Sequence, residues 1–324
     1  MTQAPLLEVE NLTKHFALRR GFLARTVAAV RAVEEVSFTI KAGETLCLVG
    51  ESGCGKSTVA KLALRLIDPT AGTIRLDGKD VTTLTPAAMR PHRRRIQIVF
   101  QDPYASLNPR LTAGRIVSEP LENYSDIATP EREARIATLF EKVGLRADAM
   151  RRYPFEFSGG QRQRLGIARA LALDPAIIVA DEPVSALDVS VQAQVLNLLM
   201  DLQEELGLAY LFVSHDLGVV EHIGHRIAVM YLGRIVEIAA KDALFEAPRH
   251  PYTQALIAAA PMPDPRGKRE RIVLQGEVPS PIAPPPGCAF HPRCPFAFDR
   301  CRIERPALKP SADSRMVACH LSDA

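Results

Sequence analysis

The segment Gly50–Thr58, GESGCGKST, constrains the fold more than any other part of the chain. It follows a short apolar run, TLCLV, and precedes TVAKLALRL, whose apolar residues have helical spacing. A glycine-rich loop between a strand and a helix turns its backbone N–H groups toward phosphate oxygens, and the helix N-terminus adds a favourable dipole. The complete G-x-x-x-x-G-K-S-T pattern at such a junction predicts a phosphate-binding loop in an α/β domain.

Several positions of this loop have a definite expected role. Lys56 should reach the β- and γ-phosphates of a nucleotide, and the Ser57 hydroxyl should ligate Mg²⁺. Cys54 lies next to the start of the helix, a position that favours a lowered thiol pKa. The residues expected to surround the nucleotide here are Gly50, Glu51, Ser52, Gly53, Cys54, Gly55, Lys56, Ser57 and Thr58.

The rest of the first 247 residues has the pattern of an α/β domain. Short β-branched runs (VSFTI, TLCLVG, IQIVF, AIIVA and AYLFV) alternate with segments of helical period, which predicts a largely parallel core sheet. From about residue 103 to 165 the strand signal disappears, and stretches such as PEREARIATLFEKVG predict an inserted helical subdomain. Another helix is expected after Ser190, which would be its N-cap.

The composition changes near Ala247. Prolines become frequent from Pro248 onward, and VPSPIAPPPG predicts an extended connection rather than a helix or strand. We therefore expect one domain over residues 1–247 and a small C-terminal extension over 248–324.

Charge and hydropathy exclude some classes of function. A formal charge of +3 and 6% aromatic residues give no basic field for nucleic acid. No apolar run approaches the ~20 residues that a membrane-spanning helix needs, so a role at the membrane would require partner subunits. The start, MTQAPLLEVENL, lacks the features of an export signal, and a cytoplasmic chain is expected.

Two further segments point to nucleotide chemistry. AIIVADEP delivers Asp181 and Glu182 to the carboxyl end of an apolar strand, where α/β sheets bind ligands. Asp181 is assigned to Mg²⁺ and Glu182 to the general base. In FSGGQRQRL, Ser158 has the features of an N-cap before two glycines, which predicts a second phosphate-binding helix end. Since one nucleotide does not need two such sites, this one is expected to close over the nucleotide of another subunit.

Together these three elements resemble the ATP-binding subunits of ABC transporters, from Leu6 to about Ala247. The resemblance implies a P-loop NTPase of the ABC type, with a RecA-like core, binding ATP and Mg²⁺. In VFQDP, Gln101 would sense the γ-phosphate and Mg²⁺, and in VSHD, His215 would contact the γ-phosphate, so that Glu182, His215 and Gln101 form the catalytic set. The family signature is matched by Ser158, Gly159, Gly160, Gln161 and Gln163, and the D-loop by Ser185–Asp188.

The resemblance also implies the assembly. Two cassettes would lie head to tail, each ATP being held between one phosphate-binding loop and the opposite signature, with Asp188 near the interface. Family members usually place an aromatic residue before the second strand to stack on adenine. The matching region, RTVAAVRAV, has none, and Phe22 lies just upstream.

The tail narrows the subfamily. HPYTQALIAAAP, GEVPSPIAPPPGCAFHPRCP and VACH resemble the extension of ATPase subunits in dipeptide and oligopeptide importers, and ESGCGKST and QDPYASLNPR look most like the second ATPase of the dipeptide pair. The implied function is ATP hydrolysis that energises import of di- or oligopeptides. The implied partners are a second ATPase subunit, two transmembrane permeases and an extracytoplasmic peptide-binding protein, at the cytoplasmic face of the inner membrane.

Other functions stay open at this point. The same extension occurs in importers of nickel, glutathione and oligosaccharides. A soluble ABC ATPase is the other class, but Lys56 and Ser158 are separated by an ordinary helical subdomain rather than by a long coiled coil or a zinc module.

Four cysteines of the extension are separated by five, six and seventeen residues; they are Cys288, Cys294, Cys301 and Cys319. Disulfides are disfavoured in a reducing cytoplasm, and zinc sites usually contain a Cys-x2-Cys pair, which is absent here. A [4Fe-4S] cluster accepts wider spacing, and the importer resemblance points the same way. We therefore expect a cluster, with zinc or free thiols as alternatives.

Overall fold

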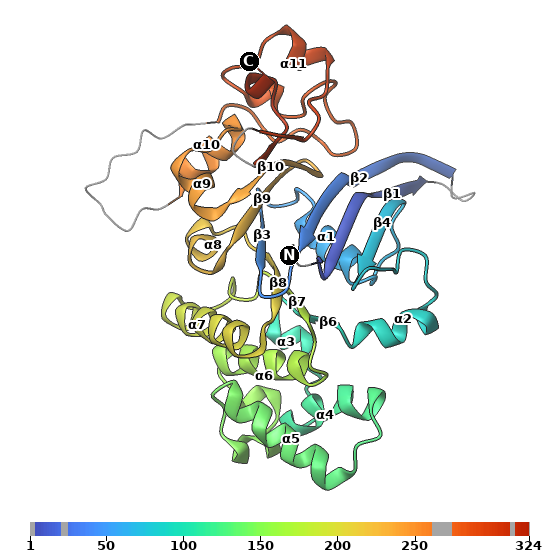
Figure 1. Ribbon diagram of the computed structural model, residues 1–324, viewed down its shortest axis with the longest axis vertical. Helices are drawn as coiled ribbons and strands as arrows, with labels where there is room; N and C mark the ends of the chain where they lie inside the picture. Colours follow the sequence, from blue (N-terminus) through green and yellow to red (C-terminus); the bar gives the residue numbers. More distant parts are fainter. Residues whose placement is uncertain (1–3, 21–24, 261–273, 312–314, 324) are drawn as a thin grey trace. The chain divides into compact units, whose positions relative to one another are not determined.

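The computed structural model describes residues 4–20, 25–260, 274–311 and 315–323 (Figure 1). Its backbone contacts divide the chain into two units, each discontinuous in sequence. The first unit contains residues up to 6, 40–44 and 84–213, and the second contains 7–39, 45–83 and 214–324. The expected domains 1–247 and 248–324 therefore stay a prediction, because the contacts define no single boundary.

The first unit is built on three parallel strands: β6 (Ile96–Val99), β7 (Ile177–Asp181) and β8 (Ala209–Val213). Every residue of β7 and β8 is buried, as expected for strands covered on both faces. In this register Val99 pairs with Ala180, and Asp181 pairs with Val213. The parallel arrangement brings the carboxyl ends of all three strands to one edge.

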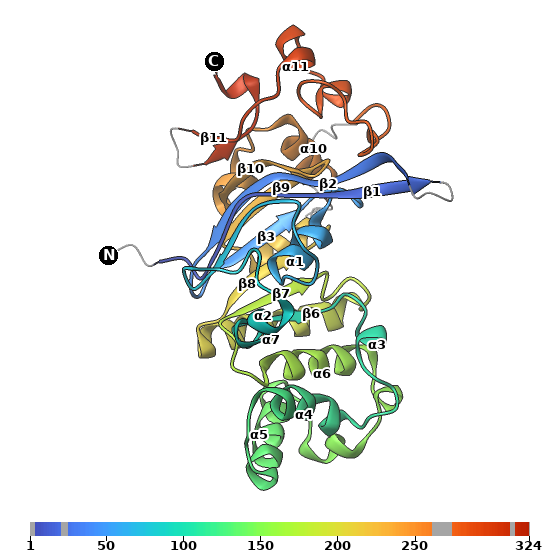
Figure 2. The ribbon, with the colours of Figure 1, turned by 90° about the vertical axis from the view of Figure 1, so that its right-hand side faces the viewer.

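Helices make up the remainder of the first unit, and in Figure 2 the helices α4, α5 and α6 lie together. Between residues 103 and 171 the structure contains helices and no strand, as the sequence predicts. Helix α4 packs against α5 and α6, and α6 packs against β6 and α7. The helices of this unit are α2 (Pro86–Arg93), α3 (Pro103–Ser106), α4 (Ala113–Tyr124), α5 (Thr129–Lys142), η1 (Ala147–Arg151), η2 (Pro154–Glu156), α6 (Gly159–Leu171) and α7 (Val189–Leu206).

The start of α7 differs from the prediction. The N-cap is Asp188 rather than Ser190, because the Gln192 N–H donates to the Asp188 carbonyl at 2.8 Å and so closes the first helical turn there. The expected D-loop residue is thus also the residue that begins this helix.

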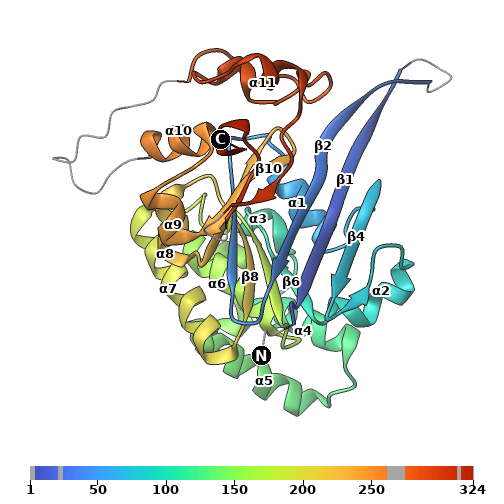
Figure 3. The same cartoon turned by 45° about the horizontal axis from the view of Figure 1, so that its top comes forward.

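The second unit contains an antiparallel sheet in the order β2-β1-β4-β5, whose longer strands run side by side in Figure 3. Its strands are β1 (Leu7–Arg20), β2 (Arg25–Ile40), β4 (Ala71–Leu76) and β5 (Lys79–Asp80). A second group of strands has the order β11-β12-β10-β9-β3, in which only the β3–β9 pair is parallel. These are β3 (Thr45–Val49), β9 (Arg226–Tyr231), β10 (Arg234–Ala240), β11 (Lys309–Pro310) and β12 (Met316–Val317).

The extension from residue 248 to 324, called the C-terminal segment below, belongs to this second unit. Strand β12 pairs with β10, with Glu237 opposite Val317, and the proline stretch VPSPIAPPPG forms neither helix nor strand, as expected. The helices of the unit are α1 (Lys56–Ala63), α8 (Leu217–Ile223), α9 (Lys241–Glu246), α10 (Pro251–Ala259), η3 (His291–Arg293), α11 (Asp299–Ile303) and η4 (His320–Asp323).

Candidate nucleotide-binding site

The loop between β3 and α1 adopts a backbone that only glycine allows at two of its positions. Gly50 and Gly55 have φ of 152° and 109°. A Cβ at Gly50 would collide with the Met230 carbonyl oxygen, and one at Gly55 with the Ala32 carbonyl oxygen. The backbones of strands β9 and β2 thus lie in close contact with the loop. The predicted order of strand, loop and helix is present.

Lys56 lies across the loop. Its ammonium donates to the carbonyl oxygens of Gly50 at 2.8 Å and Glu51 at 3.1 Å, and the residue is 5% exposed. Its ammonium also lies 3.9 Å from the Cys54 sulfur. A buried cation held by neutral carbonyls and a thiol fits an incoming phosphate, whose charged oxygens are stronger acceptors. Ser57 follows in the first turn of α1, and Ser52 and Gly53 form the exposed tip of the loop.

The expectation that the thiol pKa of Cys54 is lowered is wrong. Burial raises the pKa of its thiol, although the Lys56 ammonium acts in the opposite direction. The sequence position at a helix start predicted a lowered pKa, but desolvation of the thiolate in a residue only 7% exposed outweighs the helix end.

Glu51 is bound from the C-terminal segment. Its backbone N–H donates to the Tyr252 hydroxyl at 2.9 Å, and its carboxylate pairs with both terminal nitrogens of Arg293, at 2.8 and 3.0 Å. Sequence reasoning missed both partners. HPYTQ and HPRCP were noted only as marks of the extension, and nothing local to them points to the loop.

The end of β7 carries the two acidic residues. Asp181 is 7% exposed, and Glu182 has φ of 49°, a left-handed conformation that is strained for a residue with a side chain. The Glu182 N–H donates to the Val213 carbonyl at 3.0 Å, which holds the turn. The side-chain amide of Gln101, just beyond β6, donates to the Glu182 carboxylate at 3.0 Å. The structure thus brings these two predicted catalytic residues together.

Ser158 begins α6 with a capping box. Its hydroxyl accepts from the Gln161 N–H at 3.3 Å, and the Gln161 side chain accepts from the Ser158 N–H at 3.0 Å. Ser158 and Gly159 are exposed, whereas Gly160 is buried, and a Cβ there would collide with Val191 of α7. The glycine therefore allows α6 and α7 to approach closely and leaves the first turn uncovered.

His215 is exposed in the turn between β8 and α8. The following residue, Asp216, fixes that turn by accepting from the N–H groups of Gly218 and Val219 at 2.8 and 3.3 Å. Lys56, Ser57 and His215 belong to the second unit. The remaining residues of the loop, from Gly50 to Thr58, belong to the same unit, whereas the first unit contains Gln101, Ser158, Gly159, Gly160, Gln161, Asp181, Glu182 and Asp188.

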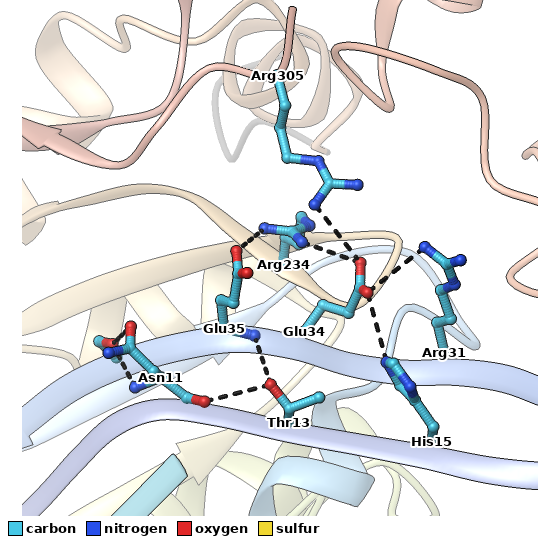
Figure 4. A network of polar contacts seen from close by, with 9 residues as sticks. Asn11, Thr13, His15, Arg31, Glu34, Glu35, Arg234 and Arg305 are labelled. Atoms are coloured by element: carbon cyan, nitrogen blue, oxygen red, sulfur yellow. Dashed lines mark hydrogen bonds and ion pairs between the residues drawn. The ribbon is translucent and has the colours of Figure 1, made fainter. Parts of the chain in front are cut away.

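A polar network surrounds Glu34 and Glu35 of β2 (Figure 4). Arg234 pairs with Glu34 at 2.9 Å and with Glu35 at 2.8 Å, and Arg305 and Arg31 approach Glu34 at 4.0 and 3.6 Å. Burial works against the Glu34 charge, but the surrounding arginines hold its pKa below the usual value. The network links β2, β10 and the C-terminal segment.

The aromatic residue considered for adenine, Phe22, lies outside the described residues. An aromatic residue that sequence reasoning overlooked is Phe16 on β1, which is 40% exposed and has the Lys14 ammonium 5.2 Å from its ring centroid. The signal was available in the sequence, since Phe16 also precedes the second strand.

The metal site expected at the four cysteines of the extension is not supported by the structure. All four cysteines of the extension line one cavity of about 10 Å³, which holds about one water molecule. Among the residues that the structure describes, no group of three or more histidine, cysteine or acidic side chains could hold a metal ion. Burial also raises the pKa of Cys288 to about 11 and that of Cys294 and Cys319, which favours thiols over the thiolates that metals bind. The predicted [4Fe-4S] cluster is therefore wrong, and the zinc alternative has no support.

Packing rather than a metal organises this segment. Phe290 is 1% exposed, and its ring centroid lies 5.2 Å from that of Tyr231, 5.5 Å from that of Tyr252 and 5.6 Å from that of His250. The Cys288 N–H donates to the Cys301 carbonyl at 2.9 Å.

In the described part of the chain, no helix is both long and apolar enough to cross a membrane.

Two family models match the chain: the ABC transporter model over residues 33–185, and the oligopeptide/dipeptide transporter C-terminal region over residues 236–301. A probable peptide ABC transporter ATP-binding protein of Sinorhizobium fredii is 63% identical over 98% of this chain and 90% of its own length. The oligopeptide transport ATP-binding protein AppF of Bacillus subtilis is 53% identical over 98% of both chains. The dipeptide transport ATP-binding protein DppF of Escherichia coli is 51% identical over 99% of this chain and 96% of its own.

Among solved structures, the dimeric ATP-binding cassette MJ0796 bound to ADP and phosphate is similar, with a TM-score of 0.65 and 32% identity over 72% of this chain and 98% of its own. The expected fold, a P-loop NTPase of the ABC type, is confirmed. The chain therefore belongs to the family of ABC transporter ATP-binding subunits, in the branch with the oligopeptide/dipeptide transporter C-terminal region, and it hydrolyses ATP.

Proposed function

We propose that this chain is the subunit whose ATP hydrolysis energises the import of di- or oligopeptides across the cytoplasmic membrane. The observation that carries the proposal is full-length similarity to ATP-binding proteins of peptide transporters, which extends through the C-terminal region. The alternatives with nickel, glutathione or oligosaccharide as cargo have no such support among these relatives, and neither has a soluble ABC ATPase.

The residues of the loop are suited to the ATP phosphates. Lys56 would exchange its two carbonyl partners for the β- and γ-phosphate oxygens, while the glycine-dependent turn presents backbone N–H groups. Ser57, Asp181 and Gln101 would hold Mg²⁺, their hydroxyl, carboxylate and amide oxygens being ligands that this ion prefers. When bound, Mg²⁺ neutralises phosphate charge.

Glu182 is the proposed general base for the attacking water. The hydrogen bond from Gln101 at 3.0 Å and the strained backbone at φ 49° fix the direction of its carboxylate, and general bases require such positioning. His215 is exposed in the turn after β8, and we assign it to the γ-phosphate.

Adenine is assigned to Phe16. Its ring is accessible, and β1 pairs with β2, whose Ala32 carbonyl presses on Gly55 of the loop. Stacking on an exposed aromatic ring raises the affinity for a nucleotide but does not discriminate between adenine and other bases.

The signature end of α6 is proposed to act in trans. Ser158, Gly159, Gly160 and Gln161 would close over the ATP of a second ABC ATPase subunit, with Asp188 at the interface, and the pair would be a heterodimer in which this chain is the second ATPase. Two transmembrane permease subunits and an extracytoplasmic peptide-binding protein complete the proposed importer, and nucleic acid has no part in it. The chain would lie at the cytoplasmic face of the inner membrane, with residues 1–247 as the ATP-binding domain and 248–324 as the extension.

The assigned base is tested in the assembled importer with Glu182→Gln. This variant should bind ATP as the native chain does, while phosphate release falls by about 100-fold or more because the general base is lost. Glu221→Gln, on the exposed side of α8, should leave turnover unchanged. Undiminished steady-state phosphate release by Glu182→Gln would remove Glu182 from this role.

The cargo is tested in vesicles that contain the complete importer. Radiolabelled dipeptide should accumulate only with ATP and native Glu182. ATP-dependent uptake of nickel, glutathione or an oligosaccharide without uptake of peptide would contradict the proposed function.

A further inference from the structure

The phosphate-binding loop and the C-terminal segment are joined at Glu51. The two terminal nitrogens of Arg293 bind the two carboxylate oxygens of Glu51 at 2.8 and 3.0 Å, although the residues are 242 positions apart. Side-chain exposure is 8% for Arg293 and 28% for Glu51. Parallel bidentate bonds in a partly buried setting are the strong and directional form of an ion pair.

The surroundings of Arg293 make its position specific. It ends η3, three residues after the buried Phe290, and its guanidinium carbon lies 5.9 Å from the Tyr231 ring centroid. The hydrogen bonds to Glu51 raise the pKa of Arg293 further above its already high value. The aromatic packing thus delivers a permanent positive charge to the edge of the loop.

The backbone of Glu51 is fixed as well as its side chain. Its N–H donates to the hydroxyl of Tyr252, which is fully buried, and its carbonyl accepts from Lys56 at 3.1 Å. Tyr252 and Arg293 of the C-terminal segment therefore both bind Glu51, whose carbonyl accepts a hydrogen bond from Lys56.

The charges of Glu51 and Arg293 indicate how this contact affects ATP binding. Glu51 places a carboxylate in a loop that receives a polyanion, and an unpaired carboxylate there would repel phosphate and weaken ATP binding. We propose that Arg293 is a positioning residue that neutralises and orients Glu51, so that the C-terminal segment sets the ATP affinity of the loop. This inference deepens the proposed function and rests on its assignment of the loop to ATP.

A purely structural role is the competing explanation. If Arg293 only anchored the C-terminal segment, loss of either partner would weaken the anchor, and loss of both would be no better than loss of one. If Arg293 neutralises Glu51, removal of the carboxylate charge should rescue the loss of the arginine. A double-mutant cycle on ATP affinity separates the two.

The experiment measures the Kd of a fluorescent ATP analogue for the full-length chain and its variants. Arg293→Met should raise Kd about 10-fold, because it leaves a carboxylate unpaired beside the phosphates. Arg293→Lys keeps the charge but loses the bidentate geometry, so its Kd should lie between those of the native chain and of Arg293→Met. Glu51→Gln should not raise Kd, and Glu51→Gln/Arg293→Met should bind more tightly than Arg293→Met alone.

The matched control is Arg300→Met. Arg300, in α11 of the same segment, forms a similar pair with Glu304 at 2.6 and 2.9 Å, and its loss should leave Kd unchanged. A native Kd for Arg293→Met, a raised Kd for Glu51→Gln, or a double variant no better than Arg293→Met would each overturn the inference. Lys56→Ala should abolish binding in every background. Retained binding by Lys56→Ala would instead refute the assignment of the loop to ATP.

Discussion

Acid should destabilise the second unit through His250, which lies at the start of α10. The residue is 1% exposed, and burial lowers the pKa of its imidazole to about 3. The neutral ring is needed because its Nδ1 accepts from the Tyr252 N–H at 3.0 Å and so caps the helix. Beside it, the buried Glu237 carboxylate accepts from the N–H groups of Arg249 and His250, both at 2.9 Å. Protonation at Nδ1 would turn this acceptor into a donor and remove the cap on the Tyr252 N–H.

The size of the effect follows from the two pKa values of His250. In the unfolded chain the ring titrates near 6.5, whereas in the folded chain it titrates at about 3. Above pH 6.5 both states are neutral, and His250 contributes no pH dependence. Below 6.5 the unfolded chain binds a proton that the folded chain cannot, so the free energy of unfolding falls until the pH reaches about 3. At pH 5 the loss is about 2 kcal/mol.

Urea unfolding at pH 7 and pH 5 measures this loss. Because the chain has no tryptophan, circular dichroism is the suitable signal. His250→Asn keeps an oxygen acceptor at the N-cap and removes the titration, so its free energy of unfolding should fall by about 2 kcal/mol less than that of the native chain between the two pH values. His222→Asn, in the exposed part of α8, should follow the native chain. The same pH dependence in His250→Asn as in the native chain would refute the reasoning.

Two further substitutions test the packing of the C-terminal segment and the adenine assignment. Phe290→Ala should lower the free energy of unfolding by about 3–5 kcal/mol, because it empties a site among three aromatic rings. Phe296→Ala, at a residue 55% exposed, should lower it by less than about 1 kcal/mol, and equal urea midpoints for the two variants would contradict the packing described. Phe16→Ala should raise the Kd for ATP about 10-fold by removing base stacking, and an unchanged Kd would exclude Phe16 as the adenine contact.

The local structure around the candidate site that the sequence predicts correctly is determined within short segments of the chain. The turn at Gly50–Thr58 depends on glycines, a preceding apolar run and a following helix, all adjacent in the chain. Asp181 and Glu182 are located in the same way, because a buried apolar strand ends at them. Parallel pairing then brings the end of β6 beside the end of β7, which explains why Gln101 reaches Glu182.

The parts that the sequence does not predict depend on distant packing. Nothing near Arg293 indicates that its partner lies 242 residues earlier. The spacing of the C-terminal cysteines was compatible with a cluster, but spacing carries no information on burial. The cavity they line is too small, and the order of the segment comes from Phe290 and its aromatic neighbours. The pKa of Cys54 was misjudged for the same reason, since a helix start is visible in sequence and desolvation is not.

The contacts of Glu51 also bear on how ATP binding and the C-terminal segment are coupled. When phosphate takes the place of the Gly50 and Glu51 carbonyls on Lys56, the loop loses two internal hydrogen bonds. The bond that the Glu51 N–H donates to Tyr252 and the bonds that Arg293 donates to the Glu51 carboxylate do not involve Lys56. These bonds keep the second residue of the loop in place during the exchange. Because coupling between two sites is reciprocal, any event that separates Arg293 from Glu51 must weaken ATP binding by the same factor by which bound ATP strengthens the Arg293–Glu51 contact. A partner subunit that binds the C-terminal segment could therefore change the affinity for ATP without touching the nucleotide.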